Sequence, residues 1–263
     1  MDQPRSFHVV TLNILYDPLA QSWPDRAPLV AAGLRALRPD IVLLQEVAWP
    51  NEQASELAAL LTSNLAFPFA AHITPLITPH GWQEALAILS RFPLLERDEL
   101  RFPDAEAFCQ RIRVTIGDRA VDLYNMHLDP YSSDRRLEQI RLLLPWMESH
   151  EGAGGIVFGG DLNARPESDE IGLLRATLRS AHVTIHSHEP VGTVPTPFGA
   201  KRNRALVPIH TLDYLWHTSD LSVTECRLTF DQPDPRDPLL YASDHYGLLA
   251  EFRLPSDQCN SMR

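Results

Sequence analysis

The sequence predicts an α/β fold in which mixed β-sheets are covered by helices, and three observations lead to this prediction. Short strand-like runs alternate with helical periodicities along the chain. A Gly117-Asp118 pair joins two of the runs as a hairpin, whereas helices separate others, so antiparallel pairs and crossover connections occur together. No stretch has the length and polarity of a linker, so we expect one domain over residues 1–263.

The strand-like runs are short and mostly apolar. Residues 41–45 and 156–159 are apolar almost throughout, which is typical of strands buried on both faces. We expect strands over residues 7–12, 41–45, 85–89, 111–116, 120–125, 156–159, 212–216, 222–230 and 248–254.

Apolar residues at helical spacing predict helices between these strands. Pro39 ends the first helix, Asp134 caps the third and Pro145 ends or kinks it, and Ser168 caps the fourth. The expected helical segments are residues 29–37, 52–65, 134–145 and 168–178.

The composition excludes several classes of protein. With 23 Lys+Arg against 34 Asp+Glu the net charge is −11, and 44% of the residues are hydrophobic. These values exclude a disordered or collagen-like chain and disfavour a protein that coats nucleic acid over its whole surface. Three widely spaced cysteines, Cys109, Cys226 and Cys259, favour a reducing, cytoplasmic location. No apolar run has the length of a signal peptide or membrane span, so we expect no stable membrane association.

Polar residues able to carry chemistry stand at the ends of the expected strands. Strand ends on one edge of a layered α/β fold converge in a crevice, so this placement points to a site, and packing alone does not explain it. The residues are Asn13, Glu46, His127, Asp161 with Asn163, Asp213, and Asp244 with His245.

The carboxylates among them fit a hard divalent cation. Mg²⁺ and Mn²⁺ take oxygen ligands and keep several waters, so one or two carboxylates are enough to bind them. Glu46 follows a nearly pure apolar run and is the best ligand candidate. Asp161 and Asn163, separated only by Leu162, either contact one ligand group together or are turn residues bonded to their own backbone.

The histidines offer proton transfer and hydrogen bonding. An imidazole acts as a general acid or base near neutral pH, so His245 beside Asp244 is a candidate for that function, with Asp213 orienting its ring. His127 is expected to donate to a phosphoryl oxygen, the alternative being a buried structural histidine.

Seven short motifs together resemble those of the endonuclease/exonuclease/phosphatase superfamily of metal-dependent phosphoesterases. They occur in the order of that family between residues 11 and 245. The motifs are Thr11-Leu12-Asn13, Leu44-Gln45-Glu46-Val47, Leu89-Ser90-Arg91, Asn125-Met126-His127-Leu128, Gly160-Asp161-Leu162-Asn163, Leu212-Asp213-Tyr214 and Ser243-Asp244-His245.

The resemblance implies a four-layer α/β sandwich, with two mixed β-sheets packed face to face and helices on the outside. It also implies Mg²⁺ or Mn²⁺ bound near Asn13 and Glu46, with Asp244 nearby.

The reaction that the resemblance implies is in-line attack of water on phosphorus. His245, paired with Asp213, would activate or stabilise, and Asp161 and Asn163 would orient the nucleophile and the phosphate. The His127-Leu128 pair is similar to that of the branch containing sphingomyelinases, deadenylases and tyrosyl-DNA phosphodiesterases.

Other polar clusters have two interpretations each. Lys201, Arg202 and Arg204, in a loop-like stretch ahead of the Asp213 strand, either bind and steer an anionic substrate or form a solvated loop. Tyr131 is either loop structure or a substrate contact, and Arg135 is expected on a solvated helix face.

Three further histidines would suit zinc. His182, His186 and His188 fall on one face of a strand-like stretch, but no carboxylate or cysteine completes the set. We therefore expect a surface cluster there.

The function predicted from these features is that of a soluble Mg²⁺- or Mn²⁺-dependent phosphodiesterase or nuclease. Its partner is a phosphate-ester substrate, with nucleic acid, nucleotide, lipid head group and protein–nucleic-acid adduct all open, and no protein partner is implied. Two alternatives remain, namely a phosphomonoesterase on small phosphates and a catalytically silent protein that binds a phosphorylated ligand.

Overall fold

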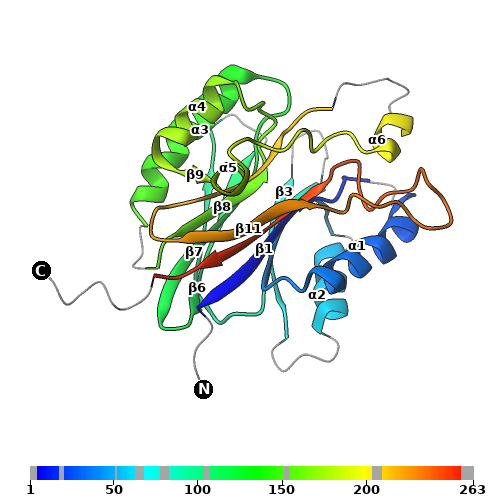
Figure 1. The fold of residues 1–263 in the computed structure, drawn as a ribbon, viewed down its shortest axis with the longest axis horizontal. Helices are drawn as coiled ribbons and strands as arrows, with labels where there is room; N and C mark the ends of the chain where they lie inside the picture. Colours follow the sequence, from blue (N-terminus) through cyan, green and yellow to red (C-terminus); the bar gives the residue numbers. More distant parts are fainter. Residues whose placement is uncertain are drawn as a thin grey trace, which may run out of the picture.

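The structure of this protein, a computed structural model, places two six-stranded β-sheets face to face with helices on their outer sides (Figure 1). For Ile77 and Arg202 only the backbone is described. The described residues are 5–17, 21–50, 52–62, 68–77, 83–103, 107–150, 154–202 and 209–255.

The first sheet is mixed and has the strand order β11-β12-β1-β2-β4-β3. β1 and β2 run parallel, and the other neighbours run antiparallel. Its strands are β1 (Ser6–Asn13), β2 (Ile41–Ala48), β3 (Ala70–Ile77), β4 (Gln83–Ser90), β11 (Ser222–Thr229) and β12 (Gly247–Arg253).

The second sheet is also mixed and has the order β5-β6-β7-β8-β10-β9. β7 and β8 run parallel, and the Gly117-Asp118 turn joins β6 and β7 as the predicted hairpin. Its strands are β5 (Leu94–Arg101), β6 (Phe108–Ile116), β7 (Arg119–His127), β8 (Ile156–Asp161), β9 (Arg179–Ser180) and β10 (Asp213–His217).

Three apolar clusters hold the layers together. Successive residues of a strand face opposite sides, so Val9 packs between the sheets while Val10 packs outward. The outward cluster of the first sheet is covered by α1 (Trp23–Leu37) and α2 (Gln53–Thr62). That of the second sheet is covered by α3 (Ser133–Glu148) and α4 (Asp169–Thr177). The predicted four-layer sandwich is confirmed.

Several elements differ from the prediction. Ser132, and not Asp134, caps α3, because its side chain accepts from the N–H of Arg135. Pro145 lies inside α3 without ending it, on the exposed side of the helix. The sequence also gave no expectation of the edge strands β3 and β5, of β9, or of the short helices α5 (Ala181–His186) and α6 (Pro197–Arg202).

The stretch carrying the three histidines is a helix and not a strand. Ser180 caps α5 by accepting from the N–H of Val183, which places His182 and His186 one helical turn apart. The ring centroid of His182 lies 4.4 Å from that of His186 and 5.6 Å from that of His188. Their ring nitrogens bond backbone carbonyls, and His182 is buried.

Candidate active site

Strand direction brings the predicted site residues to one edge of the sandwich. Asn13 ends β1 and His127 ends β7, each beside its parallel neighbour. β10 runs antiparallel to β8, so Asp213 at its start lies opposite Asp161 at the end of β8. His245 stands just before β12, which runs antiparallel to β1. These strand ends border a pocket of about 300 Å³, which Glu46, His127, Asp161, Asn163 and His245 line.

A β-bulge places Glu46 at the pocket. The register of β2 against β4 shifts between Leu44 and Val47, and Glu46 has a positive φ of 56°. The backbone N–H of Tyr16 donates to Glu46 Oε2 at 2.7 Å. The carboxylate is thereby fixed beside the end of β1, at a bulge within β2 and not at the strand end that the sequence predicts.

Asn13 bridges two carboxylates. Its Nδ2 donates to Glu46 Oε1 at 2.8 Å and to Asp161 Oδ2 at 3.0 Å, while its Oδ1 accepts from the N–H of Leu15 at 2.9 Å. Asn13 therefore ties a residue of the first sheet to a residue of the second, and draws together two oxygens that would otherwise repel each other.

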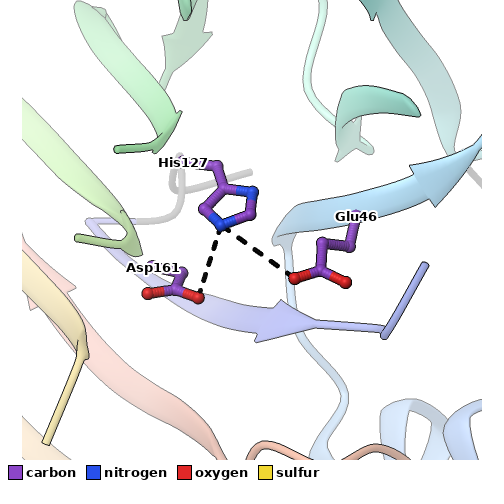
Figure 2. Close-up of side chains that lie close together, drawn as sticks. All are labelled: Glu46, His127 and Asp161. Atoms are coloured by element: carbon purple, nitrogen blue, oxygen red, sulfur yellow. Dashed lines mark ion pairs between the residues drawn. The ribbon is translucent and has the colours of Figure 1, made fainter. Parts of the chain in front are cut away.

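His127 faces the same two carboxylates (Figure 2). Its Nε2 lies 3.6 Å from Asp161 Oδ2 and 4.0 Å from Glu46 Oε1, and its Nδ1 donates to Glu84 Oε1 at 3.1 Å. Burial lowers the pKa of His127, but the hydrogen bond to Glu84 and the charge of Asp161 outweigh burial and raise that pKa to about 10. Since Nδ1 bonds Glu84, Nε2 is the ring nitrogen that faces Asp161 and Glu46, and its contact with a phosphoryl oxygen stays a prediction.

Glu84 is a site residue that sequence reasoning missed. It lies on β4 opposite Ala48 of β2, so it shares the edge at which Glu46 stands. The signal was present in the sequence, since Glu84 immediately precedes the apolar run of residues 85–89. Only the antiparallel pairing of β2 with β4 shows that the start of this run meets the site.

Asp213 and His245 form a second carboxylate–imidazole pair. His245 Nδ1 donates to Asp213 Oδ2 at 2.9 Å, and both side chains are buried. Burial raises the pKa of Asp213 to about 6. Burial lowers the pKa of His245, but the charges of Asp213 and Asp161 outweigh burial and hold it well above its usual value. The bond from Nδ1 to Asp213 therefore fixes the orientation of the His245 ring.

Asp161 stands between the two imidazoles. His245 Nε2 lies 3.8 Å from Asp161 Oδ2, the same oxygen that faces His127 Nε2. Asp161 Oδ1 accepts from the N–H of Asn163 at 2.9 Å, and Asn163 Nδ2 donates to the carbonyl of Leu128. The turn interpretation is confirmed, because Asp161 Oδ1 closes the turn, whereas a joint contact of Asp161 and Asn163 with a ligand stays a prediction.

Gly160 makes room for this arrangement. Its φ of +140° is open to glycine, and a Cβ at this position would lie 1.9 Å from the carbonyl oxygen of Met126. Any side chain here would push β8 away from β7 and separate Asp161 from His127.

Of the remaining predicted residues, Asp244 precedes His245 in the chain and Lys201 lies on α6. Asp244 is half-buried and accepts from the hydroxyl of Ser243 at 3.3 Å. A Cβ on Gly199 would lie 2.5 Å from that of Asp244, so α6 packs against Asp244. Lys201 is therefore carried by a helix and not by a loop, and it lines a separate hollow of about 450 Å³ with Phe198 and other residues. The side chain of Arg202 and all of Arg204 lie outside the described residues.

The donor set fits a hard divalent cation. Within the described ranges, Glu46, His127 and Asp161 form one group whose ligand atoms all lie within 4.8 Å of one another, and Asp161, Asp213 and His245 form another. The first group offers two carboxylates, which are the oxygen ligands that Mg²⁺ and Mn²⁺ prefer, whereas Asn13 turns its Nδ2 toward them and its Oδ1 toward the N–H of Leu15. Neither group includes Asp244 or the α5 histidines.

A four-layer α/β sandwich that gathers carboxylates and two imidazoles at its strand ends defines a phosphoester hydrolase. The model of the Endonuclease/Exonuclease/phosphatase family matches residues 10–245, and the chain belongs to this family, whose members typically use a divalent metal. No curated protein matches the chain in sequence. None of the helices in the described ranges is long and apolar enough to cross a membrane.

Solved structures share the fold. An endonuclease/exonuclease/phosphatase from Bacteroides vulgatus has a TM-score of 0.76 at 18% identity, covering 95% of this chain and 99% of its own. The human Nocturnin catalytic domain with bound sulfate anion has a TM-score of 0.74 at 21% identity, covering 95% and 94%. D. rerio TDP2 complexed with single strand DNA product has a TM-score of 0.72 at 19% identity, covering 95% and 100%.

Proposed function

We propose that this protein is a Mg²⁺- or Mn²⁺-dependent phosphodiesterase that uses in-line attack of water on phosphorus. The observation that carries the proposal is the position of Asp161 Oδ2 between the Nε2 atoms of His127 and His245. A proton acceptor between two donors suits a reaction in which water loses a proton while charge develops on phosphoryl and leaving oxygens.

Each residue then has a distinct task. Asp161 Oδ2 orients the attacking water and accepts its proton, and Asn163 holds Asp161 through the turn. His127 and His245 donate from Nε2 to the phosphoryl and leaving oxygens. Glu84 and Asp213 each accept from the Nδ1 of one imidazole and so fix the orientation of its ring.

Glu46 is the residue that would hold the divalent cation, with Asp244 nearby, and Asn13 positions the Glu46 carboxylate through its Nδ2. When bound, the cation supplies positive charge that stabilises the phosphoryl oxygens in the transition state. An anionic substrate needs such charge here, since Glu46, Glu84 and Asp161 all line the pocket.

The same carboxylates favour a diester over a monoester. A phosphodiester carries one negative charge, whereas a phosphomonoester at neutral pH carries nearly two and is repelled more strongly. Lys201, Arg202 and Arg204 are proposed to steer the anionic substrate toward the site. The DNA product in the D. rerio TDP2 structure supports nucleic acid as one substrate class.

A cytoplasmic location is proposed as well. In the described part of the chain, Cys109 and Cys226 are free and buried, in keeping with a reducing compartment. Cys259 lies outside the described residues.

A substrate panel tests the function. We would compare bis-p-nitrophenyl phosphate, p-nitrophenyl phosphate, single- and double-stranded DNA, RNA and sphingomyelin, each with Mg²⁺, Mn²⁺ or chelator. Metal-dependent turnover of diesters without turnover of monoesters is expected. Preferential turnover of p-nitrophenyl phosphate would select the phosphomonoesterase, and binding without any turnover would select the silent protein.

The panel needs two variants as controls. Asp161→Asn should abolish turnover, because it removes the proposed proton acceptor. His8→Ala changes a histidine at the opposite end of β1 from Asn13 and should leave turnover unchanged. Residual activity in Asp161→Asn equal to wild type would indicate a contaminating hydrolase.

A further inference from the structure

An exposed aromatic side chain stands at the rim of the active-site pocket. Tyr131 leaves 84% of its surface exposed, yet it lines the same pocket as Glu46, His127 and Asn163. Large aromatic side chains usually bury their rings, so an exposed ring beside a reaction centre is available to a ligand.

The backbone that carries Tyr131 is held rigidly. Asp129 Oδ1 accepts from the N–H of Tyr131 at 2.8 Å and from that of Ser132 at 2.7 Å. Arg136 Nη1 donates to the carbonyl of Asp129 at 3.0 Å. Because this turn is ordered before any ligand arrives, binding on the ring costs little conformational entropy.

A cation lines the same pocket as the ring. Arg135, in the first turn of α3, lines the same pocket and leaves 57% of its side chain exposed. Its Nη1 lies 3.2 Å from Asp129 Oδ2, which anchors one side of the guanidinium. A guanidinium has five N–H donors in a fixed plane, so this anchored group can still bind a phosphate.

We propose that Tyr131 and Arg135 form a nucleotide subsite of this pocket, in which Tyr131 stacks on a base and Arg135 binds the adjoining phosphate. The inference rests on the proposed phosphodiesterase function and assigns its substrate class as single-stranded nucleic acid. A base in a duplex is stacked on its neighbours, so only an unpaired base can lie on the ring.

The choice between substrate sources follows from the pairing of the two side chains. A head group such as phosphocholine has no second phosphate for Arg135, and a small phosphate has nothing to stack on Tyr131. A single-stranded nucleotide chain has both, in alternation, and stacking on an aromatic side chain is tolerant of base identity. The subsite is therefore expected to favour bases over abasic sugars without selecting a sequence.

Matched oligonucleotides test the stacking. Each single strand would contain one cleavable phosphodiester, and all its other linkages would be phosphorothioates. The two strands of a pair would differ only in the nucleotide beside the cleavable bond, which carries a base in one strand and is an abasic tetrahydrofuran in the other. Tyr131→Ala should raise KM about 10-fold on the strand with the base and leave kcat nearly unchanged. On the abasic strand, Tyr131→Ala and wild type should have equal KM values, and Tyr131→Phe should match wild type on both.

A second pair of substrates tests the cation. Arg135→Ala should raise KM for a dinucleotide bearing an adjoining phosphate, but not for a dinucleoside with only the cleavable phosphate. The control is Leu95→Ala, which removes an exposed apolar side chain on β5 that does not line this pocket. It should change no KM value.

Different outcomes would overturn the proposed phosphodiesterase function and the proposed nucleotide subsite. Failure of wild type to cleave any diester, including bis-p-nitrophenyl phosphate, overturns the proposed function. Cleavage of bis-p-nitrophenyl phosphate, together with a Tyr131→Ala variant that changes KM relative to wild type by the same factor on the strand with the base and on the abasic strand, overturns the subsite alone. Preferential turnover of sphingomyelin over single-stranded DNA also overturns the subsite, because it assigns the ring to a lipid head group.

Discussion

The carboxylate of Asp213 lies 2.9 Å from Nδ1 of His245, although 32 residues separate them in the sequence. Asp213 begins β10 directly opposite Asp161 in the antiparallel register, and His245 precedes β12 in the other sheet. The pair therefore joins the two sheets at the reaction centre, as the Asn13–Asp161 contact also does.

The first prediction is that these two residues act as one unit. Asp213→Asn removes the charge that orients and supports the imidazolium, and His245→Ala removes the imidazole itself. Each should lower kcat/KM by roughly 100-fold or more, and the double variant should be scarcely worse than either. Steady-state kinetics on bis-p-nitrophenyl phosphate measures all three, and losses that multiply would show that the residues act separately.

The second prediction concerns the metal. Glu46→Gln keeps the shape of the side chain but removes the negative charge that Mg²⁺ needs. Activity should fall at least about 100-fold with little change in Tm, and Mn²⁺ affinity measured by calorimetry should fall as well. The matched control is Glu52→Gln, a change to an exposed carboxylate beyond β2 that should alter neither quantity. Near-normal turnover of Glu46→Gln at saturating Mg²⁺ would contradict the assignment.

The third prediction concerns Glu84. Glu84→Gln keeps a group that can accept from His127 Nδ1, whereas Glu84→Ala does not, so Gln should retain more activity than Ala. We expect kcat to fall about 10-fold in Glu84→Ala with KM nearly constant, because orientation of His127 matters mostly in the transition state. If His127→Ala is as active as wild type, or if its loss and that of Glu84→Ala multiply, Glu84 does not act through His127.

Much of the fold was predictable because the central strands are buried on both faces. The apolar runs at residues 41–44 and 156–158 begin β2 and β8, and short runs of this kind are typical of strands covered on both faces. Of the four edge strands, β11 was predicted, whereas β3, β5 and β9 were not. Leu94–Arg101 is almost entirely exposed and mostly charged, as expected of a protected sheet edge, so it has neither an apolar run nor an alternation.

The candidate site was predictable in its residues but not in its connections. Polar side chains at strand ends identified Glu46 and His127, because strand ends converge whatever the exact topology. The bridge from Asn13 to Asp161 depends on how the two sheets face each other, which no local pattern encodes. Glu84 was missed for the same reason.

The fourth prediction concerns a buried cation that sequence reasoning would place in solvent. Arg26 is fully buried in α1, and its guanidinium donates to the carbonyls of Ile14, Leu15 and Ala242. It thereby joins the segment after Asn13 to the segment before Ser243. Arg26→Met fills a similar volume but leaves these carbonyls without their donor, so unfolding free energy should fall by about 3–5 kcal/mol.

Denaturant unfolding measures this loss, and Arg35→Met is the matched control. Arg35 lies on the same helix, is exposed and bonds only the carbonyl of Leu60 among the described contacts, so its replacement should cost less than about 0.5 kcal/mol. Equal stability of the two variants would show that Arg26 is not a structural anchor.

The last prediction is a pH dependence of stability centred on Asp129. Burial raises the pKa of this carboxyl, but the N–H groups of Ser132 and Tyr131 and the charge of Arg135 outweigh burial and hold the pKa below its usual value. The folded state therefore binds fewer protons at Asp129 than the unfolded chain does. The resulting stability is fully present above the unfolded pKa of about 4 and is lost as the pH falls through the lower folded value.

Asp129→Ala removes this contribution together with the hydrogen bonds that form the turn. At pH 7 the variant should be less stable than wild type by about 1–3 kcal/mol, and the difference should shrink as the pH falls below about 4. Urea unfolding at several pH values measures the difference, with Asp134→Ala, an exposed carboxylate in the first turn of α3, as the control. A difference that stays constant from pH 7 to pH 3 would contradict the prediction, because it would mean that the charge of Asp129 contributes nothing to stability.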